Sequence, residues 1–207
     1  MSKAIVGLIS AIMVGAFPAD AADPEHPDWP CVQRKVTELT ATQMWDRGDV
    51  GDLTQWRGNE TMQKLIAVLA SRRVPLEQAV DAIARFADSQ PPDKRDDALK
   101  QLFAGLLDAI NRDRASVMAG IERFVQRQKG RAAEIERQGA VIRQLKERAT
   151  GDDKTRAELP AAEERYNWDV RVFTERQHSL PLACEIPVLI EQRTFALGRE
   201  IGARMSD

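Results

Sequence analysis

Residues 113–149 read DRASVMAGIERFVQRQKGRAAEIERQGAVIRQLKERA, without a proline. One set of apolar residues in this stretch recurs in alternating steps of four and three positions, namely Val117, Ile121, Phe124, Ile135, Ile142 and Leu145. Such spacing places an apolar seam along one side of a helix, as in a coiled coil. Because a helix rises 1.5 Å per residue, this one is about 55 Å long and needs a partner to cover its seam.

The middle of this seam is polar. Gln128, Arg131 and Gln138 occupy the seam positions around Ile135. A seam that packs only against the other helix of its own hairpin needs no polar residues and would be expected to be apolar. We therefore expect Gln128, Arg131, Ile135 and Gln138 to be a candidate partner surface for another protein or for a second copy of the chain. The alternative is that the polar residues only set the register of two helices.

The residues that follow predict a helix that returns beside the first. Thr150–Asp153 is typical of a turn, and the return helix is expected to start near Pro160. Pro181 and Pro187 are expected to interrupt or kink it before the helix resumes toward the end of the chain. The result is a long antiparallel, coiled-coil-like helical hairpin over about residues 113–180.

The distribution of charge supports this pairing. Residues 111–150 carry ten Lys or Arg and five acidic residues, net +5, whereas residues 151–207 carry eight and eleven, net −3. Opposite charge on consecutive helices favours their antiparallel association. The whole chain has a net charge of −2, which gives no reason to expect a nucleic acid as its partner.

Upstream of the hairpin, the sequence predicts three shorter helices, over about residues 59–71, 75–89 and 93–110, with wide apolar stripes. Together with the end of the chain they are expected to form a compact helical bundle. No strand pattern of useful length is present. The 207 residues, 43% of them hydrophobic, therefore predict an all-α fold with one helical domain over residues 59–207.

Residues 22–58 predict an irregular, extended N-terminal arm with one short helix. Three prolines within DPEHPDWP, residues 23–30, exclude regular structure there, and Thr40 with Gln43 forms a capping box for the short helix. Three of the four tryptophans, Trp29, Trp45 and Trp56, lie in this arm. They form either a lid on the helical core or an exposed aromatic surface for a ligand or partner.

The first 21 residues are typical of a secretory signal peptide. Lys3 precedes an apolar run, Ala4–Phe17, and Ala19–Ala21 has the small-residue pattern of a cleavage site. The alternative is an uncleaved anchor, but the run is shorter than the roughly 20 residues that span a bilayer. We expect cleavage after Ala21, a periplasmic or secreted protein, and no membrane span after cleavage.

Export changes the meaning of the two cysteines, Cys31 and Cys184. An even number of cysteines in an oxidising compartment favours a disulfide, here one that closes a loop of about 150 residues. The alternative is two separate buried thiols. No Cys-x-x-Cys spacing is present, so a redox-active pair is not expected.

No catalytic motif is present. The chain lacks Gly-x-Ser-x-Gly, His-Glu-x-x-His, Gly-x-Gly-x-x-Gly and the Walker loop. The two histidines, His26 and His178, are expected to be solvated, although His26 with Glu25 and Asp28 offers a loose metal site as an alternative. We therefore expect no enzyme activity, no catalytic residue, no metal and no cofactor.

One short motif, Leu39-Thr40-x-x-Gln43, resembles the signature of small all-helical periplasmic stress proteins. That family includes ATP-independent chaperones and metal-responsive sensors, and the resemblance implies an exported, helical protein without a cofactor. Our leading interpretation is a non-enzymatic, protein-binding or scaffold component of the cell envelope. The alternatives are an ATP-independent chaperone or stress-responsive protein, and a binder of a small ligand or metal.

Overall fold

The fold is seen in a computed structural model, which describes residues 26–48, 50, 52–149 and 151–206. The predicted signal peptide, residues 1–21, lies outside the described residues. Within these ranges the chain forms helices and no strand, so the prediction of an all-α fold is confirmed. The elements in order are α1 (Ala41–Met44), the 3₁₀ helix η1 (Gln55–Gly58), α2 (Glu60–Ala70), α3 (Leu76–Asp88), α4 (Arg95–Arg148), α5 (Asp153–His178) and α6 (Leu180–Gly202).

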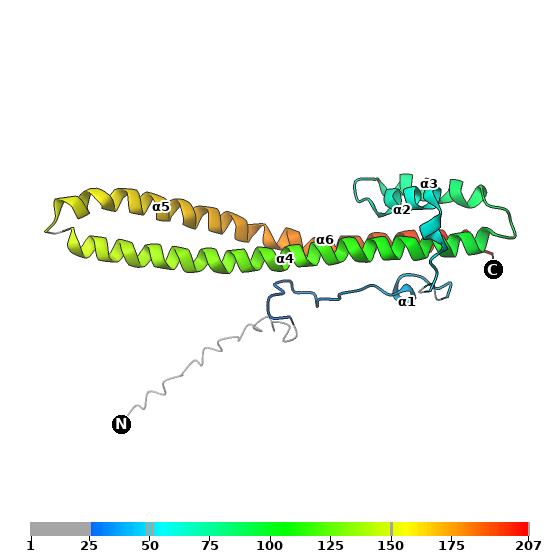
Figure 1. The fold of residues 1–207 in the computed structure, drawn as a ribbon, viewed down its shortest axis with the longest axis horizontal. Helices are drawn as coiled ribbons and strands as arrows, with labels where there is room; N and C mark the ends of the chain where they lie inside the picture. The colour runs from blue at the N-terminus through cyan, green and yellow to red at the C-terminus, as the bar shows by residue number, and fades with distance from the viewer. Residues whose placement is uncertain (1–25, 49, 51, 150, 207) are drawn as a thin grey trace, which may run out of the picture.

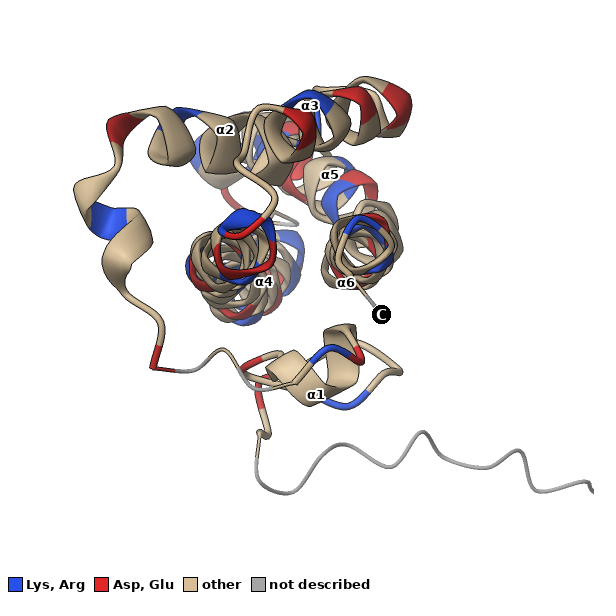
Figure 2. Ribbon diagram, turned by 90° about the vertical axis from the view of Figure 1, so that its right-hand side faces the viewer, with Lys and Arg blue, Asp and Glu red and all other residues tan. Residues whose placement is uncertain are grey.

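The molecule is an elongated helical pair with a compact end (Figure 1). α4 runs along its whole length, α5 returns beside the second half of α4, and α6 continues beside the first half. At the compact end, α2 and α3 cover one side of the α4–α6 pair, and the N-terminal arm with α1 lies on the opposite side (Figure 2). The predicted bundle with a projecting hairpin and an extended arm is therefore the observed architecture.

α4 is a single helix of 54 residues, about 80 Å long. The sequence predicted two helices here, 93–110 and 113–149, and this division was wrong. The two residues between them, Asn111 and Arg112, are neither the proline nor the glycine that ends a helix. The apolar stripe also continues past them, because both Ile110 and Met118 are buried. One helix thus belongs to both the compact end and the hairpin.

α5 begins seven residues before the predicted start at Pro160. Asp152 caps it, because the two carboxylate oxygens accept the backbone N–H groups of Lys154, at 3.1 Å, and of Thr155, at 3.3 Å. The Thr155 hydroxyl and these two amides hold the pKa of Asp152 below its ordinary value. Pro160 lies inside the helix on its exposed side, where water can bind the carbonyl oxygen that the missing N–H leaves free.

The two later prolines behave differently from each other. α5 ends at His178 and α6 begins at Leu180 with Pro181 in its first turn, so the predicted interruption occurs there. Pro187 is buried inside α6 and does not end it. The chain also forms η1, a second short helix in the arm, for which the sequence predicted only one.

The core lies at the compact end and includes part of the arm. Its fully buried side chains come from α2, α3, the first half of α4 and the second half of α6. The arm adds Trp45 and Trp56, which are buried, and the Trp45 ring stacks on Phe103 with 4.2 Å between centroids. Trp29 is buried in a second, smaller cluster near the middle of α4. The lid interpretation therefore fits three tryptophans, whereas Trp168 on α5 is 58% exposed.

A partly buried arginine of α6 contacts α2. Arg193 donates through Nε to the carbonyl oxygen of Leu69 at 3.1 Å, near the end of α2 where carbonyl groups lack helical partners. A cation at this end also interacts favourably with the helix dipole. Burial lowers the pKa of Arg193. The contact fixes the position of α2 on the long helical pair.

Candidate functional site

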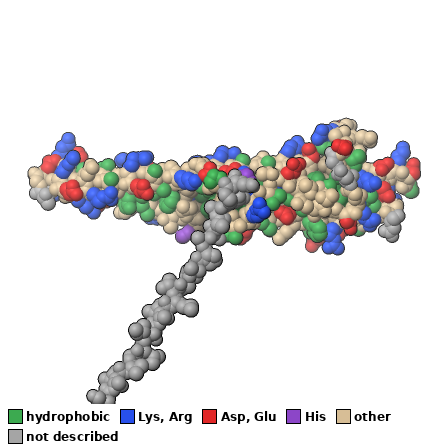
Figure 3. Space-filling view, turned by 90° about the horizontal axis from the view of Figure 1, so that it is seen from below, with side chains coloured by type: hydrophobic (Ala, Val, Ile, Leu, Met, Phe, Trp, Pro, Cys, Tyr) green, Lys and Arg blue, Asp and Glu red, His purple; other side chains and the backbone are tan. Residues whose placement is uncertain are grey.

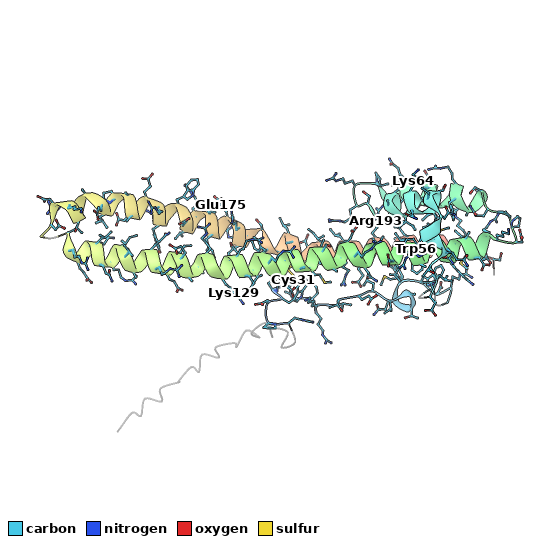
Figure 4. All side chains as sticks on the ribbon, in the orientation of Figure 1. Cys31, Trp56, Lys64, Lys129, Glu175 and Arg193 are labelled. Atoms are coloured by element: carbon cyan, nitrogen blue, oxygen red, sulfur yellow. A yellow bond between two sulfur atoms is a disulfide. The ribbon has the colours of Figure 1, made fainter. Side chains whose placement is uncertain are left out.

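The predicted disulfide between Cys31 and Cys184 is present (Figure 4). The two residues lie 153 positions apart in sequence, and their Cα atoms are 5.5 Å apart. Cys31 belongs to the start of the arm and Cys184 to the second turn of α6. The bond therefore attaches the arm to the middle of the molecule, beside the junction of α5 and α6.

Ion pairs hold the arm along α4. Asp28 accepts from Lys129 Nζ at 2.7 Å, and Lys35 Nζ lies 2.6 Å from Glu122 Oε1. The contact with Lys129 lowers the pKa of Asp28. As residue numbers rise along the arm they fall along α4, so the two run antiparallel. The arm thus follows α4 from the middle of the molecule toward the compact end.

The predicted partner residues lie between α4 and α5, inside the hairpin. Gln128 is 5% exposed and donates through Nε2 to the carbonyl oxygen of Phe173 at 3.3 Å. Arg131 Nη1 donates to Asp169 Oδ1 at 3.2 Å, and Gln138 Nε2 donates to Asp169 Oδ2 at 2.8 Å. The polar middle of the seam is therefore paired across the hairpin.

These contacts favour the alternative that the polar residues set the register of α4 against α5. Ile135 is half-buried in the same seam, and Lys146 Nζ lies 2.8 Å from Glu163 Oε1 nearer the turn. Basic side chains of α4 thus pair with acidic side chains of α5, as the distribution of charge predicted. A role of Gln128, Arg131, Ile135 and Gln138 in binding a partner stays a prediction.

Three exposed large hydrophobic side chains lie elsewhere, near the disulfide in sequence. Val32 is 88% exposed, Leu182 65% and Leu189 52%. Val32 and Leu189 line a groove of about 560 Å³ between the arm and the start of α6, whose lining also includes Pro30, Leu180 and Pro181. Leu182 follows Pro181 on α6 and does not line the groove itself. We call Val32, Leu182 and Leu189 the disulfide patch. Figure 3 shows the side of the molecule on which the arm lies, with hydrophobic side chains at the surface between charged ones.

A second groove, of about 530 Å³, adjoins the disulfide patch on the side toward the compact end. It also lies between the arm and α6, and its apolar lining consists of Trp29, Val36, Met44, Pro187, Val188 and Phe195. Arg114 of α4 reaches into it and is only 3% exposed. We call it the Arg114 groove.

The sequence analysis identified neither site. The spacing of seven residues from Leu182 to Leu189, and from Val188 to Phe195, is a signal for an apolar face on α6. It does not say whether that face is buried or exposed. Arg114 gives no signal, because an arginine in a charged helix is most often solvated.

The described part of the chain contains no three His, Cys, Asp or Glu side chains placed to hold a metal ion. Glu25, one residue of the loose site considered around His26, lies outside it. None of the described helices is long and apolar enough to cross a membrane.

No protein family model, curated protein or solved structure matches this chain. Functional inference therefore rests on the residues themselves. The motif Leu39-Thr40-x-x-Gln43 has a structural role, because the backbone N–H of Thr40 donates to Gln43 Oε1 at 3.0 Å and so caps α1.

Proposed function

We propose that this chain is an exported, non-enzymatic scaffold protein of the cell envelope that binds a partner protein through the disulfide patch. The observation that carries the proposal is the exposure of Val32 and Leu189, which line an apolar groove, together with that of Leu182, about two turns before Leu189 on α6. Contiguous apolar surface of this kind is typical of interaction sites. The disulfide patch is exposed to a partner, whereas the polar residues of the hairpin seam are paired between α4 and α5.

The arm is attached in a way that suits recognition. The disulfide at Cys31 and the hydrogen bond from Gln33 Nε2 to the carbonyl oxygen of Cys184 hold the residues on either side of Val32 against α6. A surface that is already ordered loses less conformational entropy on binding than a flexible one. The disulfide thus supports binding as well as stability.

The disulfide also supports export. Disulfides form and persist in the periplasm and outside the cell, and they are rare in the cytosol. This agrees with the secretory signal predicted for residues 1–21. We accordingly place the proposed partner in the same compartment.

Photocrosslinking in the native host tests the proposal. A photoreactive phenylalanine analogue at position 189 should give one adduct of discrete mass, and the same analogue at position 127, on the exposed side of α4, should not. Adding Leu182→Asp should abolish the adduct at position 189. An adduct of twice the mass of the chain would identify the partner as a second copy.

Two outcomes would reject the scaffold function. One is the absence of any adduct at position 189. The other is a broad series of adducts, together with suppressed aggregation of unrelated unfolded proteins without ATP, which would identify a chaperone instead.

A further inference from the structure

Arg114 is a buried cation without a close counter-ion. It is 3% exposed, and no acidic side chain in the described ranges lies within 4.0 Å of its guanidinium. Nη1 donates to the carbonyl oxygen of Val36, whereas Nε has no hydrogen-bond partner. Burial lowers the pKa of Arg114, and the charge of Glu191 acts in the opposite direction. A buried charge that is not paired is costly to a fold.

The walls of the groove explain what kind of anion suits this cation. Trp29, Met44, Val188 and Phe195 give it an apolar lining, and its volume of about 530 Å³ lies within the range of small-molecule sites. A guanidinium is planar and matches the two oxygens of a carboxylate. An apolar molecule that ends in a carboxylate would therefore satisfy both parts of the groove.

The charges around the groove favour a single negative charge. Arg34 lies at the exposed rim, so two arginines and Glu191 give the lining a net charge of +1. A dianion such as a phosphate monoester would exceed this charge and would be repelled by Glu191. A monocarboxylate balances it.

We propose that the Arg114 groove binds a monocarboxylate with an apolar tail, with the carboxylate on Arg114 and the tail against the apolar wall formed by the arm and α6. This site is separate from the disulfide patch, because Leu182 and Leu189 do not line it. It adds a small-molecule ligand to a protein proposed to bind another protein.

Calorimetry with decanoate tests the site, and decanol, which has the same tail without the charge, is the control ligand. Decanoate should bind with a stoichiometry of one to one. Because a hydrogen bond to a charged group contributes about 1.5–3 kcal/mol, decanol should bind about 10- to 100-fold more weakly. Equal binding of the two ligands, or no saturable binding of decanoate, would overturn the proposal.

Two variants assign the binding to this groove. Arg114→Met should remove the preference for decanoate, whereas Arg127→Met, at an exposed arginine of the same helix, should keep it. Phe195→Glu places an acid at the rim and should weaken decanoate binding at least tenfold; since Phe195 is 47% exposed, this variant tests the site even if Arg114→Met does not fold. Unchanged binding in Phe195→Glu would contradict the proposed site. Leu189→Asp should keep decanoate binding, which separates this site from the proposed partner surface.

Discussion

Asn111 of α4 pairs with both backbone groups of Leu39 in the arm. Its Nδ2 donates to the Leu39 carbonyl oxygen at 3.0 Å, and its Oδ1 accepts the Leu39 N–H at 2.9 Å. Leu39 itself is 2% exposed. One side chain thus pairs both backbone groups of a residue that belongs to no strand or helix, so the extended arm can lie against α4 with this N–H and carbonyl satisfied.

Asn111→Ala should lower the free energy of unfolding by about 1–3 kcal/mol, because it leaves the N–H and carbonyl of Leu39 without partners. Urea unfolding followed by circular dichroism measures the change. Asn167→Ala, at an exposed asparagine of α5, is the control and should stay within about 0.5 kcal/mol of the native protein. Equal stability of the two variants would show that water replaces Asn111 at Leu39.

Removal of the disulfide with Cys31→Ala and Cys184→Ala should destabilise the fold by at most about 5 kcal/mol, since the bond closes a loop of 153 residues in the unfolded chain. The measurement is urea unfolding of the double variant against the native protein. The native protein should also lose stability when a reductant is added, whereas the double variant should not respond. A native protein insensitive to reductant would argue against this role.

Asp169→Ala should destabilise the hairpin by about 1–2 kcal/mol, because both Arg131 and Gln138 lose their acceptor in a partly buried seam. Hydrogen exchange should increase in the second half of α4 and in α5 more than at the compact end. Asp153→Ala is the matched control, since Asp153 pairs with the exposed Arg156 on the same helix as Asp169. Exposed pairs of this kind contribute little, so similar effects of both variants would refute a structural role of the seam.

Gly198→Ala should be destabilising by about 1–3 kcal/mol, whereas Gly130→Ala should be stabilising by about 0.5–1 kcal/mol. A Cβ at Gly198 would lie 2.6 Å from the Met44 carbonyl oxygen and 3.0 Å from Phe103 Cε2, so α1 would have to move. A Cβ at Gly130 meets nothing within 4 Å. Thermal unfolding of both variants measures whether each is less or more stable than the native protein. A Gly198→Ala variant as stable as the native protein would show that the arm is not closely packed there.

Much of the fold follows from local pattern. The apolar spacing along 113–149, the charges of the two halves and the positions of the prolines predict the all-α class and the hairpin. For the continuity of α4 the local pattern gives opposing signals, because no proline or glycine ends the helix at residues 111–112 but an asparagine stands there. Asparagine favours helix ends because its side chain competes for backbone hydrogen bonds, but here Asn111 uses that capacity on Leu39, 72 positions away. A contact of this range leaves no local signal.

The candidate sites depend on tertiary packing to a greater degree. The sequence identified the polar seam, but it could not show that Asp169 lies opposite Arg131 and Gln138, because that depends on where the return helix starts. Asp152 moves this start seven residues upstream of Pro160 and so changes the register. Likewise, the exposure of Leu182 and Leu189 and the burial of Arg114 follow from how the arm lies against α6.

The disulfide joins Cys31, which precedes α4 in the sequence, to Cys184, which follows α5. The turn between α4 and α5 therefore lies within the loop that the disulfide closes. A protease that nicks the chain in that turn therefore produces two fragments that remain one covalent molecule. They would migrate together on a non-reducing gel and separate only after reduction. The tip of the molecule can be cut without releasing either half from the other.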